Sequence, residues 1–253
     1  MNIDKILGSV NIAADLDEDT LISISNQVIR GYETDCASRQ PWEEDLKNWT
    51  DLALQISTNK TFPWPNAANI KYPLLATAAM QFAARAYPTL VPSNGKLVKC
   101  RVIGTDQDGQ KSARANRIST HMSYQILDQM SDWEEDMDKL LIALPIAGTC
   151  FKKTYWDSAK QQNCSKLVLP KTLVVNYYSR SLDDAERVTE ILHITKRKIK
   201  ERQNQGIYLD VELGAPSGDS LDPLTSVNSA FQHAGTDDEV TPYVILEQHT
   251  YYD

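Results

Sequence analysis

Residues 132–157 read DWEEDMDKLLIALPIAGTCFKKTYWD, and their spacing changes from helical to strand-like within this one stretch. Ser131 lies just before them and Glu134 three residues later, a pair that predicts a capping box at the start of a helix. The stripe expected to be buried on this helix is formed by Leu140, Leu141 and Leu144. Gly148 is suited to end the helix, and the Phe, Thr, Tyr and Trp that follow favour strands. This junction predicts a helical part followed by a β-rich part.

The segments beyond the junction support an α+β fold. Stretches rich in Val, Tyr, Thr and Ile predict strands at residues 150–156, 164–170, 172–178, 187–195 and 242–252. We therefore expect a mainly helical part over residues 1–148 that packs on a β-rich part over residues 149–253. Residues 212–241, rich in Gly, Pro, Ser and Asp, are expected to form a long mobile loop.

The N-terminal region is acidic and has helical periodicity. From Asp15 to Asp51, ten acidic residues face three basic ones. One amphipathic helix with an acidic, solvent-facing side is predicted from the spacing of Leu21, Ile24, Val28 and Tyr32. Pro41 is suited to the first position of a second helix, whose apolar residues are Leu46, Trp49, Leu52, Ala53 and Ile56. The acids are interpreted as helix capping and solubility rather than as a metal site.

A proline-rich segment, FPWPNAANIKY, follows at residues 62–72. Proline fixes φ and restricts the residue before it, so Phe62 and Trp64 are expected to be extended, with their rings projecting as anchors. Asn66 or Asn69 can cap the next helix, and Pro73 fits its first turn. We interpret Phe62, Pro63, Trp64, Pro65, Asn66, Asn69 and Pro73 as a rigid elbow; an SH3-type polyproline ligand is the alternative.

Three further elements are predicted before residue 131. Residues 73–87 are almost entirely small and apolar, which predicts a helix buried on most sides at the centre of the fold. The alternation in residues 96–104 predicts a strand with one apolar face. Residues 112–130 have helical spacing again. Asp106 and Asp108 resemble the start of a calcium loop, but Arg117 stands where the glutamate is required, so a plain turn is expected.

Composition and motifs disfavour several functions. The net charge is −8, which argues against a protein that binds DNA freely. Phosphate loops, dinucleotide-binding glycine motifs, H-E-x-x-H and G-x-S-x-G are absent from the sequence, and no signal peptide or membrane span is predicted. The four histidines share no metal-ligand spacing, and the four cysteines are expected to be free thiols in a cytoplasmic setting. No catalytic residue, metal or cofactor is therefore predicted.

Two groups of basic residues are candidates for contact with phosphate or with another subunit. Lys96, Lys99 and Arg101 are followed by Lys111, Arg114 and Arg117. The more compact patch consists of Lys196, Arg197, Lys198, Lys200 and Arg202 on a short predicted helix that Gly206 ends. A solvated helix face is the alternative interpretation of this patch, because runs of charge usually have that meaning.

The order of these blocks resembles the N-terminal region of bacteriophage portal proteins, the head-to-tail connectors of tailed phages. The resemblance rests on the F-P-W-P-x-A-x-N run at Phe62–Asn69 and the apolar helix at Pro73–Tyr87. It continues through the apolar-Gly-x-x-Phe-Lys-Lys step at Ile146–Lys153 and the V-V-N-Y strand at Val174–Tyr177. These blocks are structural rather than catalytic, and the likeness extends from about Glu18 to Asp253.

The resemblance implies a structural protein and not an enzyme. Similar proteins form a ring, typically dodecameric, at one capsid vertex, through which double-stranded DNA is packaged and ejected. The implied partners are other copies of the chain, the major capsid protein, the terminase and a head-tail adaptor. The implied location is the virion, with host cytoplasm during assembly. Residues 1–253 would correspond to the wing, whereas the stem, clip and crown are not expected in this chain. A fragment of a longer portal explains this most simply; the alternative is a complete product that does not form an intact channel by itself.

Two other functions are considered. A head-tail adaptor or another virion protein is the nearer alternative, although adaptors are usually shorter and lack this block order. A metal-dependent nuclease would need convergent acids from different elements, whereas the acids here lie mainly in the first turns of predicted helices.

Overall fold

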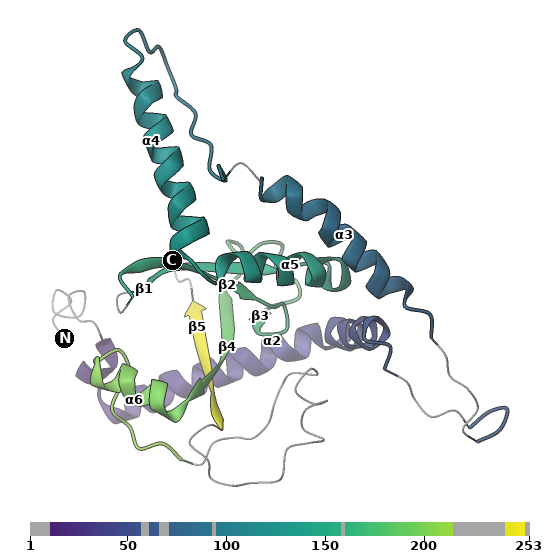
Figure 1. Ribbon diagram of the computed structural model, residues 1–253. Coiled ribbons are helices and arrows are strands. Elements are labelled where there is room, and N and C mark those ends of the chain that lie inside the picture. The colour runs from purple at the N-terminus through teal and green to yellow at the C-terminus, as the bar shows by residue number, and fades with distance from the viewer. Residues whose placement is uncertain are drawn as a thin grey trace. The chain divides into compact units, whose positions relative to one another are not determined.

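The computed structural model describes residues 11–56, 61–65, 71–92, 95–157, 160–214 and 241–250. The helices are η1 (Ile12–Asp15), α2 (Glu18–Ala53), α3 (Leu74–Leu90), α4 (Gln110–Tyr124), the π-helix η2 (Gln125–Gln129), α5 (Trp133–Ala147) and α6 (Lys196–Asn204). The strands are β1 (Phe151–Asp157), β2 (Gln162–Val168), β3 (Leu173–Val175), β4 (Arg187–Thr195) and β5 (Pro242–Thr250). Helices dominate before Gly148 and strands after it (Figure 1). The predicted α+β class is confirmed.

The contacts divide the chain into two compact units. The first unit comprises residues 1–43 and 171–253, and the second comprises residues 44–170. Helix α2 begins in the first unit and ends in the second. The contacts thus group the chain differently from the predicted division after residue 148, which stays a prediction.

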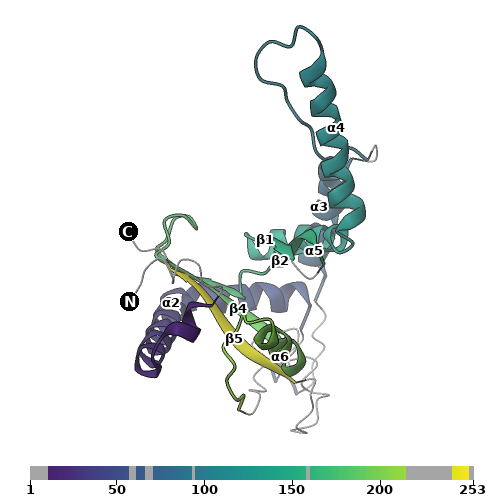
Figure 2. The ribbon, with the colours of Figure 1, turned by 90° about the vertical axis from the view of Figure 1, so that its left-hand side faces the viewer.

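The first unit is built on an antiparallel sheet in the order β3-β4-β5. Strand β4 is central, with Leu173 opposite Glu190 on one side and Leu246 opposite Ile191 on the other. Helix α6 follows β4 directly and packs on it through the buried Ile199 (Figure 2). The core of this unit includes Val174, Ala185, Ile191, Ile194 and Ile199.

The second unit combines three long helices with a β-hairpin. Strands β1 and β2 pair antiparallel from Phe151 opposite Val168 to Asp157 opposite Gln162. Helix α5 packs against both β2 and α3, and its residue Leu141 is 1% exposed. Gly148 ends α5 in the left-handed conformation, with φ of 77°, as predicted.

Four details of the predicted elements are wrong. Pro41 lies inside the continuous helix α2 instead of starting a second helix, because proline removes only one intrahelical bond. Residues 96–103 are extended chain and not a strand, since they bond to α4 rather than to another strand. The N-cap of α5 is Asp132, and Glu134 accepts a hydrogen bond from Tyr87 instead of completing a capping box. The helix predicted over residues 112–130 is divided into α4 and η2.

The predicted burial of α3 is also wrong. Only Ala79 and Ala83 are buried among its residues, while Leu74 is 70% and Met80 57% exposed. The physical reason is that, among the described elements, α3 packs mainly on α5, and one helix contact covers only one face of α3.

Candidate interaction surfaces

The first unit is held together by a polar cluster beneath α2. Asp35, fully buried, accepts hydrogen bonds from Arg187 at 2.9 and 3.1 Å and from the Asn176 amide at 3.0 Å. Gly31, one turn earlier on α2, allows Arg187 to approach, because an added Cβ would lie 3.1 Å from the Arg187 side chain. One ion pair therefore joins α2 to the start of β4.

Arg39 forms a second link between α2 and the sheet. Its guanidinium donates to the carbonyl oxygens of Leu173 at 2.7 Å and Lys171 at 3.1 Å, and it pairs with Glu43 at 2.7 Å. It also lies 5.3 Å from the centroid of the Trp42 ring. Because Asp35 and Arg39 are four residues apart, both point from the same face of α2. The acidic region predicted to face solvent therefore contains a buried acid with a structural role.

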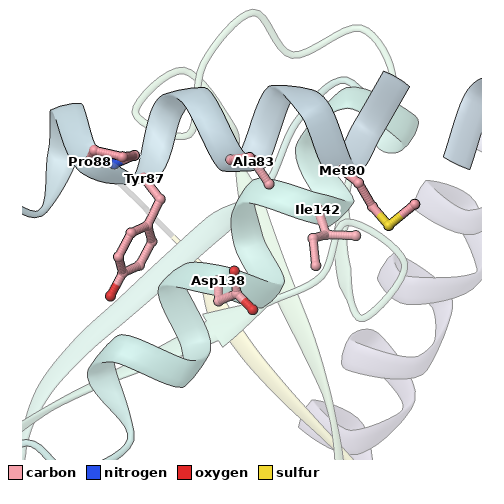
Figure 3. A pocket seen from close by; sticks show the side chains of 7 residues that line it. Met80, Ala83, Tyr87, Pro88, Asp138 and Ile142 are labelled. Atoms are coloured by element: carbon pink, nitrogen blue, oxygen red, sulfur yellow. The ribbon is translucent and has the colours of Figure 1, made fainter. Parts of the chain in front are cut away.

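In the second unit, α3 and α5 enclose a shallow apolar groove of about 340 Å³. Figure 3 shows Met80, Ala83, Tyr87 and Pro88 along α3, facing Asp138 and Ile142 on α5. Tyr87 is fixed at one end, because its hydroxyl donates to the Glu134 carboxylate. This hydrogen bond raises the pKa of Tyr87 to about 12. The groove is lined mainly by apolar side chains and one carboxylate. Such a lining is better suited to binding a protein segment than to catalysing a reaction.

Lys152 of β1 is half-buried, and its amine nitrogen is buried. The Lys152 amine of β1 is 4.9 Å from the centroid of the Trp133 ring, and among the described residues it finds no hydrogen-bond partner. Burial lowers the pKa of Lys152, although the Asp136 carboxylate partly opposes this effect. Asp136 itself accepts a hydrogen bond from the Leu167 amide of β2 at 2.7 Å. These groups tie α5 to the hairpin.

The proline-rich elbow is exposed where the structure describes it. Phe62 is 83% and Trp64 64% exposed, so their rings do not act as anchors within this chain. Pro73 is the N-cap of α3 rather than part of its first turn. Asn66 and Asn69 lie outside the described residues. The predicted anchoring is therefore wrong within the part of the chain that the structure describes, because both rings are mostly exposed there.

The predicted basic patch lies on α6, as expected from its sequence. Lys196, Arg197, Lys198 and Lys200 are exposed, and the helix ends before Gly206, which has φ of 72°. Arg202 differs from the others, because its guanidinium lies 5.2 Å from the centroid of the Tyr208 ring and donates to the Tyr208 hydroxyl. Four cations are thus available on the surface, whereas Arg202 has a local structural role. The predicted loop at residues 212–241 is described only at 212–214 and at 241.

The first group of basic residues, from Lys96 to Arg117, lies on residues 95–124, which we call the arm. Ser119 of α4 donates to the Val98 carbonyl, and Ser123 accepts from the Val98 amide at 3.1 Å. These bonds hold the extended chain beside α4 (Figures 1 and 2). Asp106 accepts hydrogen bonds from the Ser112 hydroxyl and from the Ser112 and Lys111 amides at the start of α4, and these bonds, that of the hydroxyl first, lower the pKa of Asp106. Asp106 therefore caps a helix, in keeping with the plain turn predicted there.

The ranges that the structure describes contain neither a candidate metal site nor a membrane-spanning helix. Within those residues, no group of three or more His, Cys, Asp or Glu side chains is arranged to hold a metal ion. The described helices also include none that is long and apolar enough to cross a membrane. The four cysteines are free and half-buried, and burial raises the pKa of Cys36 and Cys150.

Sequence reasoning missed the Asp35–Arg187 pair and the α3–α5 groove. The two charged residues are 152 positions apart, so no local spacing links them. The only available signal was Gly31 inside a helical pattern, since such a glycine often has a packing reason. Comparison of the chain with protein-family models and with curated proteins found no match.

Proposed function

We propose that this chain is a structural subunit of a phage portal ring at a capsid vertex. In this role it acts without catalysis, and the ring forms the conduit for packaging and ejecting double-stranded DNA. Its partners are further copies of itself, the major capsid protein, the terminase and the head-tail adaptor. The proposal starts from the order of the sequence blocks at Phe62–Asn69, Pro73–Tyr87, Ile146–Lys153 and Val174–Tyr177.

The observation that carries the proposal is the exposed apolar surface of the second unit. Leu74, Met80 and Phe82 of α3 are 70%, 57% and 44% exposed, and Phe62 and Trp64 are more exposed than Phe82. Large exposed apolar patches commonly mark surfaces that other proteins cover. These exposed apolar side chains belong to two of the portal-like blocks, Phe62–Asn69 and Pro73–Tyr87. They are the side chains that a neighbouring protein would cover. A ring of identical subunits provides such a partner for every copy.

The proposal is tested by locating the protein on native phage particles. Antibodies raised against the purified chain are bound to intact and partly disrupted particles, and gold labels are imaged by electron microscopy. Label at a single vertex, at the head-tail junction, supports the portal assignment. Label along the tail or over the whole capsid surface contradicts it.

A further inference from the structure

The arm of residues 95–124 presents one continuous exposed stripe on α4. Lys111, Arg114, Ile118 and Met122 are spaced i, i+3, i+7 and i+11, so they lie on one side of the helix. Ile118 and Met122 are each 41% exposed. Ser119 and Ser123, which bond to the extended chain, lie on another side. The stripe therefore combines two cations with two apolar side chains, and the amine of Lys111 remains exposed while donating to the Thr105 carbonyl at 3.0 Å.

The first half of α2 has a stripe of the opposite charge. Glu18, Ile22, Ser25, Ile29 and Glu33 are spaced i, i+4, i+7, i+11 and i+15, and all five are exposed. Ile22 is 53% and Ile29 46% exposed, and a carboxylate stands at each end. This stripe is distinct from the face of α2 that buries Gly31, Asp35 and Arg39. Both stripes are about 15–25 Å long at 1.5 Å per residue.

The charges of the two units are also complementary. Residues 44–170 contain fifteen Lys and Arg against twelve Asp and Glu, whereas the rest of the chain contains eleven against twenty-two. A contact between the second unit of one copy and the first unit of the next therefore joins surfaces of opposite sign. Electrostatic complementarity of this kind fixes the register of an interface and disfavours wrong pairings.

We infer that the α4 stripe (Lys111, Arg114, Ile118, Met122) docks on the α2 stripe (Glu18, Ile22, Ile29, Glu33) of a second copy of this chain. The apolar residues of the two helices pack together, and the cations pair with the carboxylates. The contact is head-to-tail, because each copy uses a different surface toward each neighbour; such contacts form a ring when the rotation between copies closes and an open filament when it does not. The inference rests on the proposed ring function and adds to it the two surfaces that join the subunits.

A second copy fits the α4 stripe better than nucleic acid does. A phosphate backbone is bound by cations and polar donors, and it offers nothing to cover exposed Ile118 and Met122. Protein interfaces, in contrast, are enriched in Arg and Met at their centres. Binding of duplex DNA to this stripe is therefore an outcome that the experiment must be able to detect.

The test uses two charge-reversed variants of the full chain. In the arm variant, Lys111→Glu and Arg114→Glu reverse the α4 stripe; in the helix variant, Glu18→Lys and Glu33→Lys reverse the α2 stripe. Assembly is measured by sedimentation velocity, and circular dichroism verifies that each variant is folded. We expect each variant alone to associate at least about tenfold more weakly than the wild type, because like charges then face each other.

An equimolar mixture of the two variants tests whether the α4 stripe contacts the α2 stripe directly. In an alternating assembly the reversed arm meets the reversed helix, and the native arm meets the native helix, so both contacts regain opposite charges. We expect the mixture to recover oligomers of wild-type size. The matched control, Lys160→Glu with Lys166→Glu, reverses two exposed lysines beside or on β2 and should assemble like the wild type.

The outcomes separate this inference from the proposed function. If the wild type forms rings and the folded arm variant forms them equally well, or if the mixture fails to recover, the inference is overturned and the ring function stands. If the arm variant keeps its oligomers but loses binding to a 30-base-pair duplex probe at low salt, the stripe is a nucleic-acid surface. A wild type that never associates overturns both.

Discussion

At the scale of single residues, the Asp35–Arg187 pair is the main link between α2 and the sheet of its unit. Asp35 is 0% exposed and Arg187 retains a 28% exposed side chain, so removing the carboxylate leaves a partly buried charge without its partner. Breaking a buried pair in this way typically costs 3–5 kcal/mol, and the exposure of Arg187 places the expected cost near the lower end, at about 3 kcal/mol.

The Asp35→Ala variant is therefore expected to unfold at a clearly lower denaturant concentration than the wild type. Urea unfolding followed by circular dichroism measures the change. The control is Asp45→Ala, an exposed acid on the same helix outside the proposed interface, which should change the free energy of unfolding by less than about 0.5 kcal/mol. Equal effects of the two substitutions would show that the pair does not hold α2 to the sheet.

Lys152 is expected to destabilise the second unit at neutral pH. Burial lowers the pKa of Lys152 in the folded state, so folding disfavours its charged form. This loss of folding stability is fully present at a pH below the pKa of Lys152 in the folded state. It disappears as the pH rises through that value toward the pKa in the unfolded state, about 10.4. Lys152→Met should raise the melting temperature at pH 7 by about 2–4 °C, since Met also packs well against the Trp133 ring.

This prediction is checked by thermal melting at pH 7 and at pH 10. The gain from Lys152→Met over the wild type should shrink at the higher pH, whereas the exposed control Lys166→Met should show little change at either. A variant that is less stable than the wild type at pH 7 would mean that the cation–π contact with Trp133 outweighs the cost of burial.

At the scale of elements, the arm depends on two serines that hold the extended chain to α4. Replacing Ser119 and Ser123 with Ala removes both bonds to Val98, each worth about 1 kcal/mol. Residues 95–104 should then open more often, and trypsin should cleave after Lys99 and Arg101 about tenfold faster or more, because cleavage follows the open population. Mass spectrometry of limited digests gives the rate at each site.

Thr120→Ala is the matched control for the arm. Its hydroxyl bonds only within α4, to the Asn116 carbonyl at 3.0 Å, so its loss should leave the cleavage rates at Lys99 and Arg101 unchanged. If the double serine variant is cleaved no faster than this control, the serine bonds do not hold the arm together.

The elements also show how far the sequence predicts this molecule. Strands β1, β2 and β4 and helix α6 are local patterns of residue type and spacing, and all were predicted near their observed positions. The alternation in residues 96–104 predicted a strand, but a strand needs a partner, and these residues meet α4 instead. The position of Pro41 predicts a helix start, because local rules do not count the many other hydrogen bonds of a 36-residue helix.

The same reasoning explains the outcome for the candidate surfaces. The α6 patch was predictable because its cations are consecutive in the sequence, whereas the engagement of Arg202 by Tyr208 depends on a turn after the helix. The apolar residues of α3 predict a buried helix, but most of its surface is exposed. Hydrophobicity alone does not specify whether an apolar face is covered by the same chain or by a partner. The groove with Asp138 and Ile142 needed the packing of two helices to be known.

At the scale of the whole molecule, the exposed elbow should contribute to assembly rather than to the stability of one chain. Trp64 is 64% exposed, so Trp64→Ala removes little packing inside the subunit. We expect this variant to keep the wild-type melting temperature and to form fewer oligomers, as measured by mass photometry. A large loss of melting temperature with normal assembly would instead make Trp64 an internal anchor.

The proposed function requires that this chain closes into a ring of identical subunits. Negative-stain electron microscopy of the purified protein tests it most directly, because class averages distinguish rings from other assemblies without any functional assay. We expect end-on views of closed rings with a single rotational symmetry. Class averages that show only separate 28.5 kDa monomers, or open filaments without closure, would contradict it.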